Sequence, residues 1–330
     1  MTGLLQWVQR KWIALPGVLL VALGAGLWGT DGLFRRGLAL ELPSATVVFW
    51  EHLILVVVTA PLLVRFYRNR PELAPRDLFA LILVGVGASA LATMLFTEAF
   101  SYGDPTTPLL LQKLQPVIAV LGAYVLLRER LLPRYGVYFL LAVGSAYLIS
   151  FSDPTNVSVS QLEPALLAVG AASLWGLGTV VGRHLTAKIE PNQLTALRFA
   201  IGLPASAIIL VWRGETSAAS GVSSGDLGTL VGLALIPGLA AITVYYRGLS
   251  ATPASLATLA ELAFPLTAIL IGWSVFDTVP SRTQWLGIAI LASTIVVMAR
   301  AARQHAEALG VVAPARASAR PTPASERATS

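Results

Sequence analysis

The string AGLWG occupies positions 25–29, and 147 positions later the string ASLWG occupies positions 172–176. An arginine follows each string at the same distance, at Arg36 and at Arg183. Two prolines, Pro116 and Pro265, stand at nearly the same spacing within later apolar segments. We interpret the chain as an internal duplication, because chance similarity between apolar segments is the weaker explanation for matched Trp-Gly pairs and matched prolines.

The composition around these strings is that of a membrane protein. Hydrophobic residues make up 55% of the 330 positions and charged residues only 12%, whereas soluble domains carry roughly 25% charged residues. Such a chain cannot cover a water-facing surface, so its outer surface must face lipid. The apolar runs extend over roughly 18–23 residues without alternation, which predicts helices that cross a hydrocarbon core of about 30 Å rather than a β-barrel.

Turn-forming residues divide the chain into ten apolar segments, so the sequence predicts an all-α protein with ten transmembrane helices. Because five is an odd number, two copies of five helices must cross the membrane in opposite directions, and such inverted repeats are typical of alternating-access transporters. The predicted segments are 14–34, 44–64, 78–100, 106–127, 134–151, 162–183, 192–212, 227–247, 254–276 and 283–300.

These segments define the domain organisation. We predict a cytoplasmic N-terminal segment at 1–13, a first five-helix repeat at 14–151 and a second at 152–300. The tail at 301–330 is rich in Ala, Pro, Ser and Arg, and we expect it to be disordered because it contains too little apolar material to pack.

Charge placement predicts the orientation and the compartment. Most lysines and arginines fall on one side of the predicted membrane, and the positive-inside rule therefore places both termini in the cytoplasm of an inner (plasma) membrane protein. The net charge of +6 is accounted for by these loops, so we do not expect nucleic acid as a partner.

The sequence also limits the chemistry. The chain has no cysteine and only three scattered histidines, so neither a metal site nor another cofactor is expected. Its one G-x-S-x-G string, at 221–225, lies in a Ser/Gly-rich loop without the strand-to-helix context that this motif needs. We therefore expect no enzyme. No carbonyl filter of a channel and no nucleotide-binding loop is recognisable.

Several short motifs resemble those of the drug/metabolite transporter superfamily, in its ten-helix EamA branch. They are LWGT at 27–30, LWG at 174–176, LRF at 197–199 and the stretch from GDP at 103–105 through LQKLQP at 111–116 to RER at 128–130. The resemblance covers about residues 14–300. It implies a basket of two inverted five-helix repeats around a central cavity, which moves metabolites, often outward.

One position departs from the pattern of this family. The second helix of such proteins often carries an Arg-Phe pair like Arg198-Phe199, whereas this chain has Glu51-His52 there. Because an acidic residue stands where a basic one is common, the resemblance to the family does not by itself assign a substrate to this protein.

Ionisable residues within apolar segments are costly and normally mark a pathway or an ion pair. The candidates are Asp31, Glu51, His52, Glu98, Lys113, Arg198 and Glu261.

The fourth segment carries the densest polar group. Gln112, Gln115 and Pro116 share one helical face, and Lys113 lies at its edge. We predict that this face lines a cavity, where Lys113 meets a carboxylate or phosphate of the cargo. The alternative is a structural ion pair of Lys113 with Glu98 or Glu51.

Glu261 lies four residues before Pro265, as Gln112 lies four before Pro116, so the repeat predicts symmetry-related positions for the two polar residues. Glu261 either exchanges a proton for cargo or balances the charge of Lys113. For Glu51 and Arg198 we expect a structural ion pair between the second and seventh segments.

Aromatic and imidazole groups complete the set of candidates. Trp28 and Trp175 occur in the middle of their segments, where they either line the cavity or belong to an interface belt. For His52, whose side chain type titrates close to physiological pH, a buried, hydrogen-bonded histidine is the favoured interpretation and a role in coupling is the alternative. The belt is the expected place of the tyrosines near segment ends, which are Tyr102, Tyr245 and Tyr246.

The sequence thus predicts a secondary transporter, with export of small metabolites such as amino acids or drug-like solutes by alternating access as the favoured activity. A flippase or scramblase for lipids or lipid-linked headgroups is the alternative. The expected partners are a small-molecule substrate, membrane lipids and protons as a coupling ion.

Overall fold

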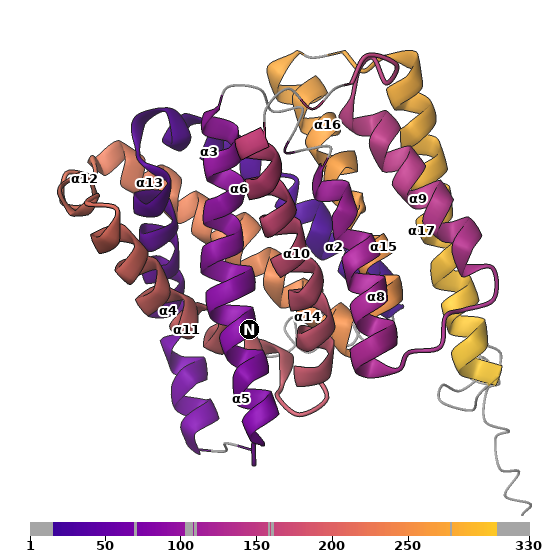
Figure 1. Ribbon diagram of the computed structural model, residues 1–330, viewed down its shortest axis with the longest axis horizontal. Helices are drawn as coiled ribbons and strands as arrows, with labels where there is room; N and C mark the ends of the chain where they lie inside the picture. Colours follow the sequence, from indigo (N-terminus) through magenta and orange to yellow (C-terminus); the bar gives the residue numbers. More distant parts are fainter. Residues whose placement is uncertain are drawn as a thin grey trace, which may run out of the picture.

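The computed structural model describes residues 16–308 except 69–70, 103–107, 109–110, 158, 160–161 and 278, and every regular element among them is a helix (Figure 1). The first half contains α2 (Gly17–Trp28), α3 (Asp31–Glu41), α4 (Ser44–Arg68), α5 (Pro75–Ile82), a π-helical stretch (Leu83–Leu91), α6 (Ala92–Ser101), a 3-10 turn (Gln112–Leu114), α8 (Gln115–Leu127) and α9 (Tyr135–Ser150).

The second half follows a similar order, with one continuous helix, α10, in place of α2 and α3, and with the additional short helix α12. It contains α10 (Leu162–Leu185), α11 (Pro191–Trp212), α12 (Thr216–Ser220), α13 (Ser224–Leu233), a second π-helical stretch (Ala234–Ala240), α14 (Ala241–Ser250), α15 (Ala254–Ala260), α16 (Ala263–Phe276) and α17 (Arg282–Ala308). Within the described residues, eight continuous helices are long and apolar enough to cross a membrane, and Gln112–Leu127 and Tyr135–Ser150 are shorter apolar helices. The predicted helical membrane fold is therefore confirmed.

Two predicted boundaries differ from the structure. α17 continues to Ala308, eight residues into the segment that we expected to be disordered, because residues 301–308 contain good helix formers and no proline. Residues 309–330 and the predicted N-terminal segment 1–13 lie outside the described residues. At the other end of the bundle, the first predicted segment is interrupted at Gly29 and Thr30 and continues as α3 to Glu41.

The two halves interleave rather than sit side by side. α2 packs against α14, α4 against α11, α8 against α10, and α9 against α17, and each of these pairs joins one helix from each half. Figure 1 shows the last pair along one side of the molecule and α4 with α11 on the other side.

Glycine permits the closest of these contacts. A Cβ atom on Gly24 of α2 would lie 2.8 Å from the backbone nitrogen of Tyr245 in α14. A Cβ atom on Gly248 of α14 would lie 2.5 Å from the nitrogen of Val21. The two backbones can touch only because neither position carries a side chain, as is common where membrane helices pack closely.

Four helices near the centre of the bundle depart from α-helical geometry. The π-helical stretches interrupt the third and eighth membrane helices at equivalent places in the two halves. The 3-10 turn at Gln112–Leu114 interrupts the fourth, and a turn at Glu261 and Leu262 interrupts the ninth. Such departures are frequently found at functional sites, and interrupted membrane helices form the binding sites of many transporters.

Candidate functional site

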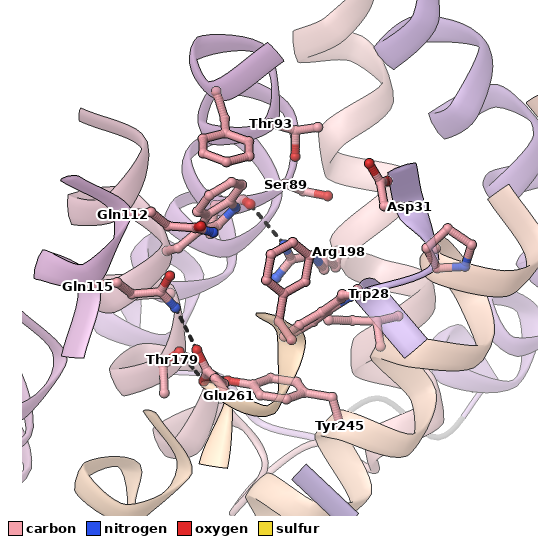
Figure 2. A pocket seen from close by; sticks show the side chains of 18 of the residues that line it. Trp28, Asp31, Ser89, Thr93, Gln112, Gln115, Thr179, Arg198, Tyr245 and Glu261 are labelled. Carbon is pink, nitrogen blue, oxygen red and sulfur yellow. Dashed lines mark hydrogen bonds between the residues drawn. The ribbon is translucent and has the colours of Figure 1, made fainter. Parts of the chain in front are cut away.

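A cavity of about 210 Å³ lies where these interruptions meet, and its lining comes from both halves (Figure 2). The first half contributes residues from α2, α3, α4, the first π-helical stretch, α6 and the start of α8. The second half contributes residues from α10, α11, the second π-helical stretch, α14 and the turn between α15 and α16. Most of the candidates from the sequence line this cavity. They are Trp28, Glu51, His52, Gln112, Lys113, Gln115, Trp175, Arg198 and Glu261.

Aromatic rings cover much of the cavity wall. The ring of Trp28 lies 5.0 Å from that of Tyr245 between centroids, at an interplanar angle of 45°. On α10, Trp175 meets Phe96 in an edge-to-face contact with centroids 5.0 Å apart. Of the two alternatives left open for Trp28 and Trp175, both residues therefore follow the first and line the cavity, and each packs against a neighbouring ring.

Tyr245 corrects the sequence analysis. We expected Tyr245 and Tyr246 in an interface belt, but both are buried, and the Tyr245 hydroxyl reaches the cavity floor. The reason is the close contact of α14 with α2, which places the end of α14 against the interior instead of against lipid. The position of a residue along its segment could not reveal this, because it indicates the depth in the membrane and not whether the side chain faces lipid or the interior.

The Glu261 carboxylate forms the centre of a hydrogen-bond network on the cavity floor (Figure 2). Its Oε1 accepts hydrogen bonds from the Thr179 hydroxyl at 2.9 Å and the Tyr245 hydroxyl at 2.8 Å. Its Oε2 accepts one from the Gln115 amide at 2.5 Å. Among the described residues, no Lys or Arg nitrogen lies within 4.0 Å of this carboxylate, so it does not balance Lys113 by direct contact.

Lys113 is buried, with 8% of its surface exposed, and lines the cavity from the 3-10 turn. Neither of its expected alternative partners binds it: Glu98 pairs with Arg213 and Glu51 with Arg35. The adjacent Gln112 has a side-chain oxygen that is buried without a hydrogen-bond partner. The backbone carbonyl of Gln112 is occupied despite the following Pro116, because the 3-10 turn directs the Gln115 N–H to it.

The expected ion pair of Glu51 with Arg198 is wrong. Arg35 of α3 binds Glu51 at 3.1 Å and Asp31 at 2.7 Å. Arg198 instead donates hydrogen bonds to the carbonyl of Ala88 at 2.8 Å and to the Tyr246 hydroxyl at 3.2 Å. Arg35 lies one residue beyond the first predicted segment, 14–34, but the continuation of the first membrane helix as α3 carries its side chain into the cavity.

His52 matches its expected structural role. Its Nδ1 lies 2.8 Å from the carbonyl of Val48 and its Nε2 lies 3.0 Å from the hydroxyl of Ser89. Both ring nitrogens are therefore occupied. Ser89 belongs to the first π-helical stretch, whose polar lining the sequence analysis missed; the only signal was the Gly85 and Gly87 pair, which weakens a regular helix at this place.

Hydrogen bonds and ion pairs join the two halves at both ends of the bundle. At the end that carries the start of α5, Asp77 lies 2.6 Å from both His184 and Lys188. At the opposite end, Glu98 pairs with Arg213 at 2.9 Å, which places Glu98 away from the cavity. A carrier that opens alternately to the two sides must break one set of such contacts at a time.

A second contact reinforces the α5 end. The Glu129 carboxylate, in the loop after α8, accepts hydrogen bonds from the backbone N–H of Ala254 at 2.7 Å and of Ser255 at 3.0 Å. It also accepts one from the Ser255 hydroxyl at 2.9 Å. A residue of the first half thereby caps the first turn of α15 in the second half.

The described residues contain no group of three His, Asp or Glu side chains that could hold a metal ion. The site instead combines aromatic rings, neutral hydrogen-bonding groups and charged side chains, and both halves of the helical membrane fold contribute to it. Such a site can bind and release an organic solute, which defines the class as a membrane transporter of the inverted-repeat type.

Family comparison agrees with this class. The model of the EamA-like transporter family matches residues 15–151 and again residues 163–300, and the chain therefore belongs to this family. The two matches coincide with the two halves that were recognised from the repeated strings. Membership identifies the protein as a membrane transporter and not an enzyme.

Curated relatives are also transporters. The chain is 29% identical to the riboflavin transporter ImpX of Fusobacterium nucleatum over 87% of this chain and 98% of that protein. It is 28% identical to the uncharacterized transporter YwfM of Bacillus subtilis, over 87% of this chain and 95% of that protein. A riboflavin transporter of Brucella anthropi is 25% identical over 78% of this chain and 89% of its own length.

A solved crystal structure with 18% sequence identity superimposes with a TM-score of 0.67, covering 90% of this chain and 99% of the other. At this identity the likeness concerns the fold alone.

Proposed function

We propose that this protein is a secondary transporter that carries a small planar heteroaromatic metabolite, with riboflavin as the first candidate, by alternating access. The observation that carries the proposal is the pair of aromatic contacts in the cavity lining, Trp28 with Tyr245 and Phe96 with Trp175, each of which joins a ring of the first half to a ring of the second. The names of the Fusobacterium and Brucella relatives support the choice of riboflavin.

The chemistry of the cavity fits such a solute. The flat ring system of a flavin can stack on indole and phenyl rings, and aromatic pairs gain about 0.5–1.5 kcal/mol beyond their buried area. Its ring carbonyls, ring N–H and sugar-alcohol hydroxyls need donors and acceptors, which Gln112, Gln115 and Thr179 offer around the same cavity. An amino acid, the cargo class first expected, would leave most of the aromatic surface unused.

Alternating access is supported by the interleaved halves and by the contacts that close both ends of the bundle. The cavity of about 210 Å³ is smaller than the roughly 300–1,000 Å³ of pockets that hold drug-sized ligands. Binding of a flavin therefore requires the halves to separate around it, which weakens one of the two sets of closing contacts.

We further propose that both termini lie in the cytoplasm, that transport is outward, and that protons are the coupling ion. The outward direction follows from the resemblance to exporters. Glu261 supports proton coupling, because it is a cavity carboxylate that bonds only to the neutral groups of Gln115, Thr179 and Tyr245 among the described residues. Transport of lipid headgroups is the competing function, and no feature of the cavity favours it over an aromatic solute.

The test is a binding titration with riboflavin, using the full-length protein in lipid nanodiscs and the fluorescence of the flavin as the signal. Riboflavin should saturate the protein, and Trp175→Leu should weaken binding about tenfold, as expected for loss of a stacking partner. Trp212→Leu is the matched control, since Trp212 is 84% exposed on the outside of α11. Failure of riboflavin to bind, with thermal stabilisation by phospholipids alone, would reject the proposal in favour of lipid transport.

A further inference from the structure

Lys113 differs from every other charged residue of the cavity in having no partner among the described residues. Asp31 and Glu51 share the guanidinium of Arg35, Glu261 accepts three hydrogen bonds, and Arg198 donates two. The Lys113 ammonium has neither an ion pair nor a hydrogen bond within the described part of the chain, although its side chain is more than nine-tenths buried.

A buried charge without a partner is costly. Removing an ammonium group from water without compensating hydrogen bonds is so unfavourable that buried charges in proteins are paired or bind ions. Lysines in the middle of membrane segments are correspondingly rare and normally mark a substrate or ion pathway. Because no described residue of the chain supplies a partner for Lys113, we look for one among the molecules that enter the cavity.

The neighbouring residue carries a second unsatisfied atom. The side-chain oxygen of Gln112 is buried without a partner, and Gln112 also lines the cavity (Figure 2). Both residues belong to the 3-10 turn that precedes α8. A cation and an adjacent amide on one turn offer N–H donors to an anionic oxygen group, with the amide oxygen left to accept from a hydroxyl of the same ligand.

The other charges leave this corner available to an anion. The three carboxylates of the cavity lining are all occupied: Asp31 and Glu51 by Arg35, and Glu261 by neutral donors. None of them lies within ion-pair distance of Lys113 among the described residues. An incoming phosphate or carboxylate would thus meet a free cation without displacing an existing salt bridge.

We propose that Lys113 and Gln112 form an anion subsite within the solute cavity, and that the preferred cargo is a planar heteroaromatic compound that carries a phosphate or carboxylate group. This inference rests on the proposed function, since it assigns the charge of a solute whose ring the aromatic wall holds. It also distinguishes this protein from a carrier of riboflavin alone, because riboflavin has no such group.

Matched pairs of ligands test the charge separately from the ring. Flavin mononucleotide differs from riboflavin by one phosphate, and nicotinate differs from nicotinamide by a carboxylate in place of an amide. Both pairs are titrated against the wild-type protein in nanodiscs, and against Lys113→Gln and Lys113→Arg. We expect the anionic member of at least one pair to bind about tenfold more tightly than the neutral member, which corresponds to about 1.4 kcal/mol.

The variants decide whether Lys113 is responsible. In Lys113→Gln the preference should disappear while affinity for the neutral member changes less than about threefold, and in Lys113→Arg the preference should remain, since the cation is kept. The inference is overturned if the wild type prefers neither anion, if the preference persists in Lys113→Gln, or if Lys113→Gln weakens both members of a pair equally.

A second measurement keeps this inference separate from the proposed function. Inorganic phosphate, at constant ionic strength, should raise the melting temperature of the wild type and not that of Lys113→Gln. If riboflavin fails to bind but phosphate gives this difference, the proposed ring specificity is wrong and the anion subsite stands. If riboflavin binds but phosphate and the anionic ligands show no dependence on Lys113, the anion subsite is rejected and the proposed function stands.

Discussion

The amide of Gln115 donates a 2.5 Å hydrogen bond to the carboxylate of Glu261, and this bond crosses the boundary between the two halves of the chain. Gln115 begins α8 directly after the 3-10 turn, and Glu261 follows α15 in the turn before α16. The bond therefore connects the interruption of the fourth membrane helix to that of the ninth. Relative movement of these two helices during transport must change it.

Loss of the Gln115 donor should destabilise the protein. Gln115→Leu leaves Oε2 of the buried Glu261 carboxylate without a partner, and an unsatisfied buried group costs about 1–3 kcal/mol. We expect a lower melting temperature and weaker riboflavin binding, measured on the same nanodisc preparation. Gln284→Leu provides the control, because the Gln284 side chain bonds only to backbone groups among the described residues. Its amide N–H donates to the Ile149 carbonyl at 3.0 Å, and its Oε1 accepts from the Ser281 N–H at 2.8 Å. An equal or larger loss in the control would show that Gln115 has no special role.

Replacement of Glu261 should separate binding from coupling. Glu261→Gln keeps a side chain of the same shape but cannot exchange a proton, so we expect riboflavin binding to persist while flux driven by a pH gradient falls at least about tenfold. Flux is measured in proteoliposomes with and without an imposed gradient. Unchanged flux with unchanged pH dependence would clear Glu261 of proton coupling.

Much of the fold could be predicted because it depends on local sequence. Apolar length gave the membrane helices, and the repeated Trp-Gly strings gave the two halves that the family matches delimit. The sequence could name Trp28, Trp175 and Glu261 as cavity candidates because they lie mid-segment or at symmetry-related positions, and all three line the cavity. Each of these inferences uses spacing along one segment or between two copies of it.

The partners of the charged residues could not be predicted in the same way. Arg35 binds Glu51 only because the first membrane helix bends at Gly29 and continues as α3, and a one-turn error in its end moves Arg35 from cavity to loop. The same limit applies to Tyr245, whose direction depends on the crossing of α14 with α2. The rotation of each helix about its own axis decides which side chains face the cavity. That rotation depends on packing between helices, which cannot be read from a single sequence.

A buried lysine that has no partner among the described residues should be a source of instability. Lys113→Met replaces the ammonium with an apolar group of similar length. We expect the free energy of unfolding to rise by on the order of 1 kcal/mol, and the melting temperature to rise with it, while binding of anionic ligands is lost. Lys188→Met is the matched control and should lower the melting temperature, because it removes the ion pair with the buried Asp77. A fall for Lys113→Met would indicate that Lys113 stabilises the fold.

Glu129 should hold the α5 end of the bundle closed. Glu129→Ala leaves the N–H groups of Ala254 and Ser255 without their acceptor, and loss of a cap typically costs about 0.5–2 kcal/mol. We expect a lower melting temperature together with faster labelling of a cysteine introduced at position 258, which lines the cavity. Asp153→Ala serves as the control, since Asp153 bonds only within its exposed loop, to Thr155. Labelling rates that match the wild type would show that this contact does not control access.

The crossing of α2 with α14 should tolerate no side chain at Gly24. Gly24→Ala places a methyl group 2.8 Å from the nitrogen of Tyr245, so the helices must separate, and overpacking of this kind costs about 1–3 kcal/mol. The displacement would move Tyr245 away from Glu261, so riboflavin binding should fall together with the melting temperature. Gly144→Ala is the matched control in α9, where a new Cβ meets nothing within 4 Å. There the higher helix propensity of alanine should leave stability unchanged or raise it by up to about 1 kcal/mol. If both variants behaved alike, helix propensity rather than backbone contact would govern this position, and the close α2–α14 crossing would not be what aligns Tyr245 with the cavity.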